Sequence, residues 1–232
     1  MMVLEAVDLA KTYTGGDGGL ISVLDGINLQ VQRGEMVAIL GASGAGKSTL
    51  LHLLGALDRP TRGAVRIAGE PVDGRSDEAL SALRNRRVGF VFQFHHLLRE
   101  FSALENVMMP MRIGGWGDRR ARSRAMELLS RVGLAGRITH RPGELSGGEQ
   151  QRTAVARALA VDPAVVLADE PSGNLDHANS ERLHDLFAEL SRDLEIAMVV
   201  VTHNRSLATR ADRSLLLDEG RLIDVGVREV VP

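Results

Sequence analysis

Residues 36–49 read MVAILGASGAGKST, an apolar run followed by a glycine-rich segment that ends in lysine, serine and threonine. Residues 41–48 fit the pattern G-x-x-x-x-G-K-[ST], in which backbone N–H groups surround phosphate oxygens and glycines keep the approach open. The apolar run predicts a buried strand before the loop. Leucines at positions 50, 53, 54 and 57 predict an amphipathic helix after it, ending at Pro60. The stretch therefore predicts an α/β fold with a phosphate-binding loop.

The loop carries the chemistry expected of a nucleotide site. Lys47 is expected to neutralise the terminal phosphates, and the Ser48 hydroxyl to ligate Mg²⁺. Only two of the 28 basic residues are lysines, and Lys47 is one of them. A compact ammonium reaches between phosphates where a planar guanidinium does not fit. The predicted nucleotide-binding residues here are Gly41, Ala42, Ser43, Gly44, Ala45, Gly46, Lys47, Ser48 and Thr49.

A second apolar run, residues 165–168, ends in two carboxylates, Asp169 and Glu170. Ligands in open α/β sheets bind at the carboxyl ends of the strands, so both side chains are expected to face the phosphate site. Asp169 is expected to hold Mg²⁺ through water, and Glu170 to polarise the attacking water. A strand followed by an acidic helix cap is the alternative interpretation, and the phosphate loop favours the functional one.

The remaining pattern predicts a parallel core with additions. Ile27, Leu29 and Val31 alternate with polar residues, which predicts a half-buried strand of an N-terminal antiparallel β subdomain, with a turn at 15–19. Strands at 165–168 and 197–201 flank a helix with apolar residues on one face, which is a βαβ unit of a parallel sheet. Residues 215–225 predict a hairpin.

We expect one domain over residues 1–232. Its catalytic core covers about 1–93 and 161–232, and an inserted helical subdomain covers about 94–160, where the pattern is mostly helical.

The composition of the chain limits the class of protein and the cellular compartment. Hydrophobic residues make up 44% and charged residues 25%, which is ordinary for a globular protein. No apolar run approaches the roughly 20 residues that a membrane-spanning helix needs. The absence of cysteine excludes disulfides and thiolate metal sites, and no cleavable secretion signal is visible, so we expect the chain to work in the cytoplasm. A net charge of −2 gives no basic field for nucleic acid.

Residues 145–149 read LSGGE, between the phosphate loop and the carboxylate strand. A serine hydroxyl and glycine amides at a helix start form an anion site, although a plain helix cap is an alternative. With these motifs in this order, the chain resembles the nucleotide-binding subunits of ATP-binding-cassette (ABC) transporters over all 232 residues. The resemblance implies a P-loop ATPase that uses ATP and Mg²⁺ and closes two copies of itself around ATP. The residues expected to complete the partner copy's site are Ser146, Gly147, Gly148, Glu149 and Asp176.

Other residues match motifs of the same family. Tyr13 resembles the aromatic residue that stacks on adenine, and Gln93 the glutamine that senses Mg²⁺ and water and joins the core to the helical subdomain. Residues 172–176 resemble the loop that couples the two sites, with Asp176 at its end. His203 resembles the histidine that contacts the γ-phosphate. The resemblance therefore implies catalytic roles for Glu170, His203 and Gln93, and a metal site of Ser48, Gln93 and Asp169.

Residues 94–98 (FHHLL) and 101–110 (FSALENVMMP) resemble the ATPases of lipoprotein-releasing systems within this family. That resemblance implies a peripheral protein at the cytoplasmic face of the inner membrane. Its two copies would serve two non-identical transmembrane permease subunits and power the release of lipoproteins toward a periplasmic carrier. His95 and His96 are expected to contact a membrane subunit.

Alternatives remain at this stage. Macrolide-efflux and cell-division ATPases share most of these motifs. DNA-maintenance ATPases usually add a coiled-coil insert, a cysteine hook or basic faces, and this chain has no cysteine, no sustained heptads and no strongly basic balance. A nucleotide-binding protein without turnover is a further class, and the presence of Glu170 beside Asp169 argues against it.

Overall fold

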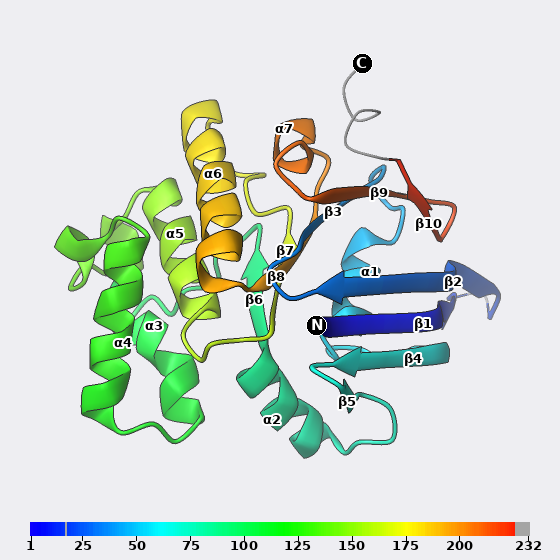
Figure 1. The fold of residues 1–232 in the computed structure, drawn as a ribbon, viewed down its shortest axis with the longest axis horizontal. Coiled ribbons are helices and arrows are strands. Elements are labelled where there is room, and N and C mark those ends of the chain that lie inside the picture. Colours follow the sequence, from blue (N-terminus) through cyan, green and yellow to red (C-terminus); the bar gives the residue numbers. More distant parts are fainter. Residues whose placement is uncertain (17, 226–232) are drawn as a thin grey trace.

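Two β-sheets and the helices around them make up the fold in the computed structural model, which describes residues 1–16 and 18–225. The strand order is β2-β1-β4-β5 in the smaller sheet and β10-β9-β3-β8-β7-β6 in the larger one. Figure 1 shows α3, α4 and α5 grouped beside the β6 edge of the larger sheet, away from the smaller sheet. This is the α/β architecture that the sequence predicts, with an antiparallel sheet beside a mainly parallel one.

The smaller sheet is antiparallel and comes from the N-terminal part of the chain. Its strands are β1 (Met2–Thr14), β2 (Leu20–Gln32), β4 (Arg62–Ile67) and β5 (Glu70–Pro71). The predicted alternation in β2 is confirmed, because Ile27, Leu29 and Val31 are buried between exposed polar neighbours. Asp17, in the predicted turn, lies outside the described residues.

The larger sheet is parallel except at one edge. Its strands are β3 (Met36–Leu40), β6 (Val88–Phe92), β7 (Val165–Asp169), β8 (Ala197–Val201), β9 (Arg213–Asp218) and β10 (Arg221–Asp224). The last two form the predicted hairpin. Phe92 pairs with Asp169 and Asp169 with Val201, so neighbouring strands end at the same level.

Helices connect the strands and pack around the two sheets. They are α1 (Lys47–Leu54), α2 (Asp77–Arg87), α3 (Ala103–Ile113), α4 (Asp118–Arg131), α5 (Gly147–Ala158), α6 (His177–Leu194) and α7 (Arg205–Ala208), with 3₁₀ turns at Ala135–Arg137 and Pro142–Glu144. In the described ranges, no helix is both long and apolar enough to cross a membrane.

Alternate residues of each parallel strand enter different hydrophobic cores. Met36 and Ala38 of β3 pack in the core shared with α3, α4, α5 and α6. Val37 and Ile39, on the opposite face, pack with α1, α2 and the smaller sheet. Strands buried on both faces read as continuous apolar runs, which is why residues 36–40, 165–168 and 197–201 show no polar alternation.

The prediction that α1 ends at Pro60 is wrong. The helix ends at Leu54, with Gly55 as its C-cap, and Ala56 takes a left-handed backbone conformation with φ 55°. A Cβ at Gly55 would lie 2.3 Å from Cζ of Phe90, so the chain approaches the sheet too closely for a larger residue. Leu57 consequently leaves the helical stripe and is 46% exposed.

Gly89 of β6 allows α5 to pack directly against the sheet, since a Cβ there would lie 2.4 Å from the backbone oxygen of Ala158. We predict that Gly89→Ala lowers the free energy of unfolding by about 1–3 kcal/mol, the usual cost of overpacking. Gly136→Ala is the matched control, because a Cβ there meets nothing within 4 Å. Chemical denaturation measures both, and equal stability of the two variants would contradict this packing argument.

Candidate nucleotide-binding and hydrolytic site

The candidate site is a cavity of about 890 Å³ at the carboxyl edge of the larger sheet. The neighbouring strands β3, β8, β7 and β6 each end beside it, and the segment after each strand supplies part of its lining. The predicted residues that the structure brings together here are Ser43, Gly44, Gly46, Lys47, Ser48, Thr49, Gln93, Asp169, Glu170 and His203. Motifs that are more than 150 residues apart in the chain thus form one site.

The loop between β3 and α1 has the geometry of an anion site. Gly44 and Gly46 have φ of 81° and 98°, left-handed values that favour glycine. A Cβ at Gly46 would also lie 2.9 Å from Cγ1 of Val23. No side chain caps the N-terminus of α1, so its first N–H groups and the helix dipole can interact with an anion. Triphosphate oxygens fit this arrangement.

Lys47 lies between the loop and the carboxylates. Its Nζ donates to the backbone oxygens of Gly41 at 2.9 Å and Ala42 at 3.0 Å, and lies 4.0 Å from Oε1 of Glu170. The side chain is largely buried. Its charge is therefore held among the residues that line the cavity, and its role in neutralising a polyphosphate stays a prediction.

The donor set also fits Mg²⁺. The Ser48 hydroxyl and the Asp169 carboxylate line the same cavity, and Mg²⁺ prefers oxygen ligands, often one or two from protein with the remainder from phosphates and water. Within the described ranges, no group of three or more His, Cys, Asp or Glu side chains could hold a metal alone. A magnesium ion shared with nucleotide phosphates does not require such a group.

Glu170 is held in a strained position. Its φ of 43° is left-handed, a conformation that costs on the order of 1–3 kcal/mol in a non-glycine residue. Its backbone N–H donates to Val201, which fixes the turn. Its carboxylate accepts from Oγ1 of Thr202 at 3.1 Å and from the backbone N–H of His203 at 3.3 Å, and lies 2.9 Å from Nδ1 of His203. The carboxylate is therefore oriented by contacts within the protein.

Gln93 connects the end of β6 to the loop at 172–176. Its Nε2 donates to Oδ1 of Asn174 at 3.1 Å, and Nδ2 of Asn174 donates to the backbone oxygen of Gln93 at 3.2 Å. A Cβ at Gly173 would lie 2.9 Å from Nε2 of Gln93, so a larger residue there would displace the end of that side chain. These two hydrogen bonds connect the two loops.

Tyr13 lies at the end of β1, outside the cavity lining, and is 40% exposed. Its hydroxyl donates to Oδ2 of Asp58 at 3.0 Å, and partial burial and the Asp58 carboxylate raise the pKa of Tyr13. Nζ of Lys11 lies 2.8 Å from Asp58 and 4.8 Å from the ring centroid. The ring is thus fixed with an accessible face, and its stacking on adenine stays a prediction.

The LSGGE segment forms a helix N-terminus away from the cavity lining. Oγ of Ser146 accepts from the Glu149 N–H at 3.3 Å, and the Glu149 carboxylate accepts from the Ser146 N–H at 2.8 Å. Because the Ser146 hydroxyl accepts this bond, its proton remains available for an external acceptor. Asp176 likewise caps α6, accepting from Asn179 at 2.9 Å. Within one copy these residues are helix caps, and their role in a partner's site stays a prediction.

Three residues with evident roles carry no sequence-based prediction of their own: Thr202, Asn174 and Asp58. Thr202 directly precedes His203 in the sequence, and this position is the one feature that could have indicated a role for it in the site. The partners of Asn174 and Asp58 lie 81 and 45 residues away, and no local pattern indicates such contacts.

A phosphate loop, a carboxylate pair and a histidine at the ends of adjacent parallel strands define a P-loop nucleotide hydrolase. A family model described as ABC transporter matches residues 24–173. The chain belongs to the ABC transporter family and is its ATP-hydrolysing type of subunit.

Similar proteins match nearly the whole chain. The lipoprotein-releasing system ATP-binding protein LolD of Geobacter metallireducens is 54% identical over 221 residues, covering 95% of this chain and 98% of that protein. The protein of the same name from Bordetella pertussis is 54% identical over 219 residues, covering 94% of each. A solved dimeric structure of the ATP-binding cassette MJ0796 in a post-hydrolysis state, bound to ADP and Pi, has a TM-score of 0.87 at 37% identity, covering 97% of this chain and 99% of that one.

The Glu149 carboxylate should make the stability of α5 depend on pH. Hydrogen bonds from the Ser146 backbone and from Arg137 lower the pKa of Glu149 to about 2. A lowered pKa stabilises the folded chain above the unfolded pKa, and this contribution is lost as the pH falls toward the folded value. We predict that Glu149→Gln lowers the melting temperature at pH 7 and that the difference from the parent protein shrinks between about pH 5 and pH 2.

Differential scanning calorimetry over that range measures the effect. Glu189→Gln, a change at an exposed carboxylate on α6, is the matched control. A Glu149→Gln difference that stays constant down to pH 2 would show that the capping interaction does not depend on the charge.

Thr202 should control the position of the Glu170 carboxylate. Thr202→Val removes the hydroxyl that donates to Glu170, and hydrogen bonds to charged groups contribute about 1.5–3 kcal/mol. We predict a roughly tenfold or larger fall in kcat for ATP hydrolysis with little change in ATP affinity. Thr202→Ser keeps the hydroxyl and should retain most of the rate. Equal rates for the two variants in a steady-state phosphate-release assay would contradict the prediction.

Proposed function

We propose that this chain is the ATP-hydrolysing subunit of a membrane complex that releases lipoproteins from the inner membrane toward a periplasmic carrier. The observation that carries the proposal is the match to proteins named for that system over more than nine-tenths of both chains. The whole chain is one ATP-binding domain in this proposal, with the core at about 1–93 and 161–232 and the helical subdomain at about 94–160.

The contacts of Glu170 support its assignment as the base. Its carboxylate, oriented by Thr202 and His203, polarises the attacking water, and Lys47 and the loop amides neutralise the phosphates. His203 lies largely exposed beside the carboxylate, where it can contact the γ-phosphate. Ser48, Asp169 and Gln93 would hold Mg²⁺, which when bound offsets charge on the phosphate oxygens. Phosphoryl transfer needs this positioning and charge neutralisation more than covalent chemistry.

Two copies are proposed to close around ATP. Ser146, Gly147, Gly148 and Glu149 lie at a helix N-terminus that contributes nothing to the cavity of its own copy. Such a terminus binds anions well, which suits the γ-phosphate held by a partner. Asp176 is the N-cap of α6 and ends the 172–176 loop, which contacts Gln93 through Asn174. In this proposal Asp176 lies at the same interface. The dimeric MJ0796 structures provide the precedent.

A groove of about 790 Å³ supports docking of a transmembrane permease subunit. It lies between α2, β6 and α3, and its apolar lining includes Leu57, Phe90, Met109, Pro110 and Ile113. Leu57 and Ile113 are both exposed. Apolar side chains gathered on a protein surface are typical of a site that binds a partner. Two copies would present two such grooves, one for each of two non-identical permease subunits, and the ATPase would then lie peripherally on the cytoplasmic face of the membrane.

The segment at 94–98 adjoins this groove through Arg157. That side chain of α5 lines the groove and donates to the backbone oxygens of His95 at 2.8 Å and His96 at 2.7 Å. The ring of Phe94 is exposed, and His96 has a left-handed φ of 47°. The backbone of both histidines is therefore held next to the groove, whereas the His96 side chain lines the nucleotide cavity and Nε2 of His95 is buried.

Glu170→Gln tests the hydrolytic assignment. It keeps the shape of the side chain and removes the base, so we predict that ATP binding persists while hydrolysis falls by about 10²–10⁴-fold. Binding is measured with a fluorescent nucleotide and hydrolysis by phosphate release. Glu189→Gln should hydrolyse ATP normally. Near-normal turnover in Glu170→Gln would overturn the assignment of the base.

The same variant identifies the partners. Tagged Glu170→Gln is expressed in the native cell, membranes are solubilised with ATP and Mg²⁺, and co-purifying proteins are identified. Two different permease subunits together with lipoprotein support the proposal. A single self-pairing membrane protein indicates efflux of the macrolide type, and DNA or soluble partners alone overturn the transporter assignment.

A further inference from the structure

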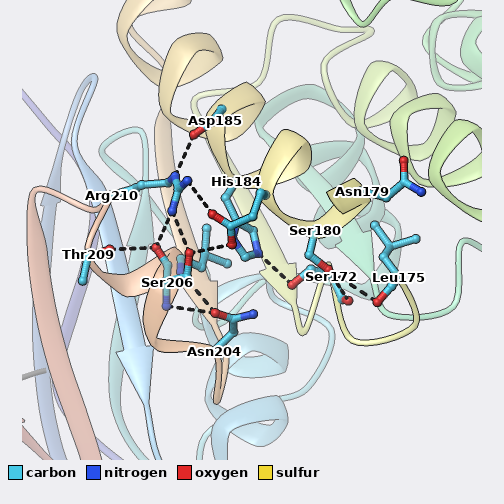
Figure 2. Close-up of polar contacts among 12 residues, drawn as sticks. Ser172, Leu175, Asn179, Ser180, His184, Asp185, Asn204, Ser206, Thr209 and Arg210 are labelled. Carbon is cyan, nitrogen blue, oxygen red and sulfur yellow. Dashed lines mark hydrogen bonds and ion pairs between the residues drawn. The ribbon is translucent and has the colours of Figure 1, made fainter. Parts of the chain in front are cut away.

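A cluster of polar side chains lies on α6, α7 and the segments beside them (Figure 2), and none of its members lines the nucleotide cavity. At its centre is His184, which is fully buried and has no part in the site described above. Its Nε2 lies 2.9 Å from Oγ of Ser172, and its Nδ1 lies 3.5 Å from Oε1 of Glu181 without the geometry of a hydrogen bond. A buried imidazole whose Nδ1 has no hydrogen-bond partner among the described residues needs an explanation.

The surroundings of His184 select one protonation state. Burial lowers the pKa of His184, which favours the neutral ring. The charged groups that face it are Glu181 and Asp185 of α6 and Arg210, which follows α7. The Glu181 carboxylate beside Nδ1 favours the tautomer with its proton on that atom. Nε2 then accepts, and the Ser172 hydroxyl donates to it.

Glu181 connects the histidine to the segment that follows β8. Its Oε1 accepts from Oγ of Ser206 at 2.7 Å, and its Oε2 from Nη2 of Arg210 at 2.8 Å. Ser206 donates its N–H to Oδ1 of Asn204 at 2.9 Å, and Arg210 also binds Asp185 at 2.8 Å. Figure 2 shows these contacts joining α6 to α7.

This network connects to Glu170 in two ways, through the chain at Ser172 and through hydrogen bonds at Asn204 and Thr202. Ser172 comes two residues after Glu170 and begins the loop at 172–176. Asn204 comes directly after His203, and its N–H donates to Oγ1 of Thr202 at 2.9 Å, the same hydroxyl that donates to Glu170. The hydrogen bonds therefore run from Glu170 through Thr202 and the α7 segment to Glu181 of α6, and His184 of the same helix binds the loop beyond Glu170.

We propose that His184 is a positioning residue for ATP hydrolysis. By accepting from Ser172, it holds the 172–176 loop in a fixed arrangement with the 202–206 segment, so that Glu170 and His203 keep their mutual position and Asp176 keeps its place at the proposed interface. The inference rests on the hydrolytic role proposed for Glu170. An apolar side chain at position 184 would leave the Ser172 hydroxyl buried without an acceptor and would release this constraint.

The test compares three variants of the full chain. His184→Phe fills the space without an acceptor, whereas His184→Gln keeps an acceptor of similar reach. Ser191→Ala is the matched control, since Ser191 is a buried polar residue of α6 that binds Gly34 and Ile196 far from the site. We expect His184→Phe to lower kcat about 5–30-fold, the size of one lost hydrogen bond, with ATP affinity within about twofold. His184→Gln should recover most of the rate, and Ser191→Ala should lower the melting temperature while kcat is unchanged.

A double-mutant cycle decides whether His184 acts through Ser172. Ser172→Ala should lower kcat as much as His184→Phe, and the double variant should lose no more than either single one. Additive losses would overturn the proposal, as would a His184→Phe variant with normal kcat and a lowered melting temperature. If His184→Phe does not fold, an unchanged kcat in Ser172→Ala overturns it equally. Failure of the Glu170 assignment is separate, because it is recognised by turnover in Glu170→Gln.

Discussion

The register of the larger sheet determines where this chain can do chemistry. Because β3, β8, β7 and β6 are paired in parallel and end at one level, each following segment reaches the same small volume. The phosphate loop, His203, Glu170 and Gln93 are thereby brought together. A shift by one residue in any of these strands would also exchange its two buried faces, so the hydrophobic cores and the site enforce the same register.

The backbone strain in the site lies at Glu170, the residue proposed to act on water. Neighbouring residues hold its carboxylate in place. Glu170 has a left-handed backbone, and donors from the adjacent strand end, Thr202 and His203, hold its carboxylate. His184 binds Ser172 of the 172–176 loop, and Glu181 of the same helix binds Ser206 of α7. These contacts connect the loop to α6 and α7. Such support is needed because a carboxylate that acts on water must be oriented in advance, and a flexible loop alone would not hold it.

The sequence is most informative where local chemistry decides the structure. Buried runs such as 36–40 and 197–201 gave strands with the predicted bounds, since burial on both faces leaves a plain apolar signal. The end of α1 was predicted wrongly because the close approach of Gly55 to Phe90 is a tertiary contact. Thr202, Asn174 and His184 were missed for the same reason. The roles of Ser146 and Tyr13 remain predictions, because they depend on a second copy or a nucleotide.

Helix α5 has a further consequence for how force passes through the molecule. Its N-terminus carries the LSGGE segment that is proposed to meet the partner's ATP, and Arg157 near its other end holds the backbone of His95 and His96 beside the groove proposed for a permease. Twelve residues of helix form a rod of about 18 Å. A hydrogen-bonded rod resists shortening, so in the proposed complex closure of two copies at the N-terminal end of α5 would displace or tilt the end beside the groove proposed for a permease. In the proposed complex the stiffness of this helix would determine how much of the motion at the ATP site reaches the membrane subunit.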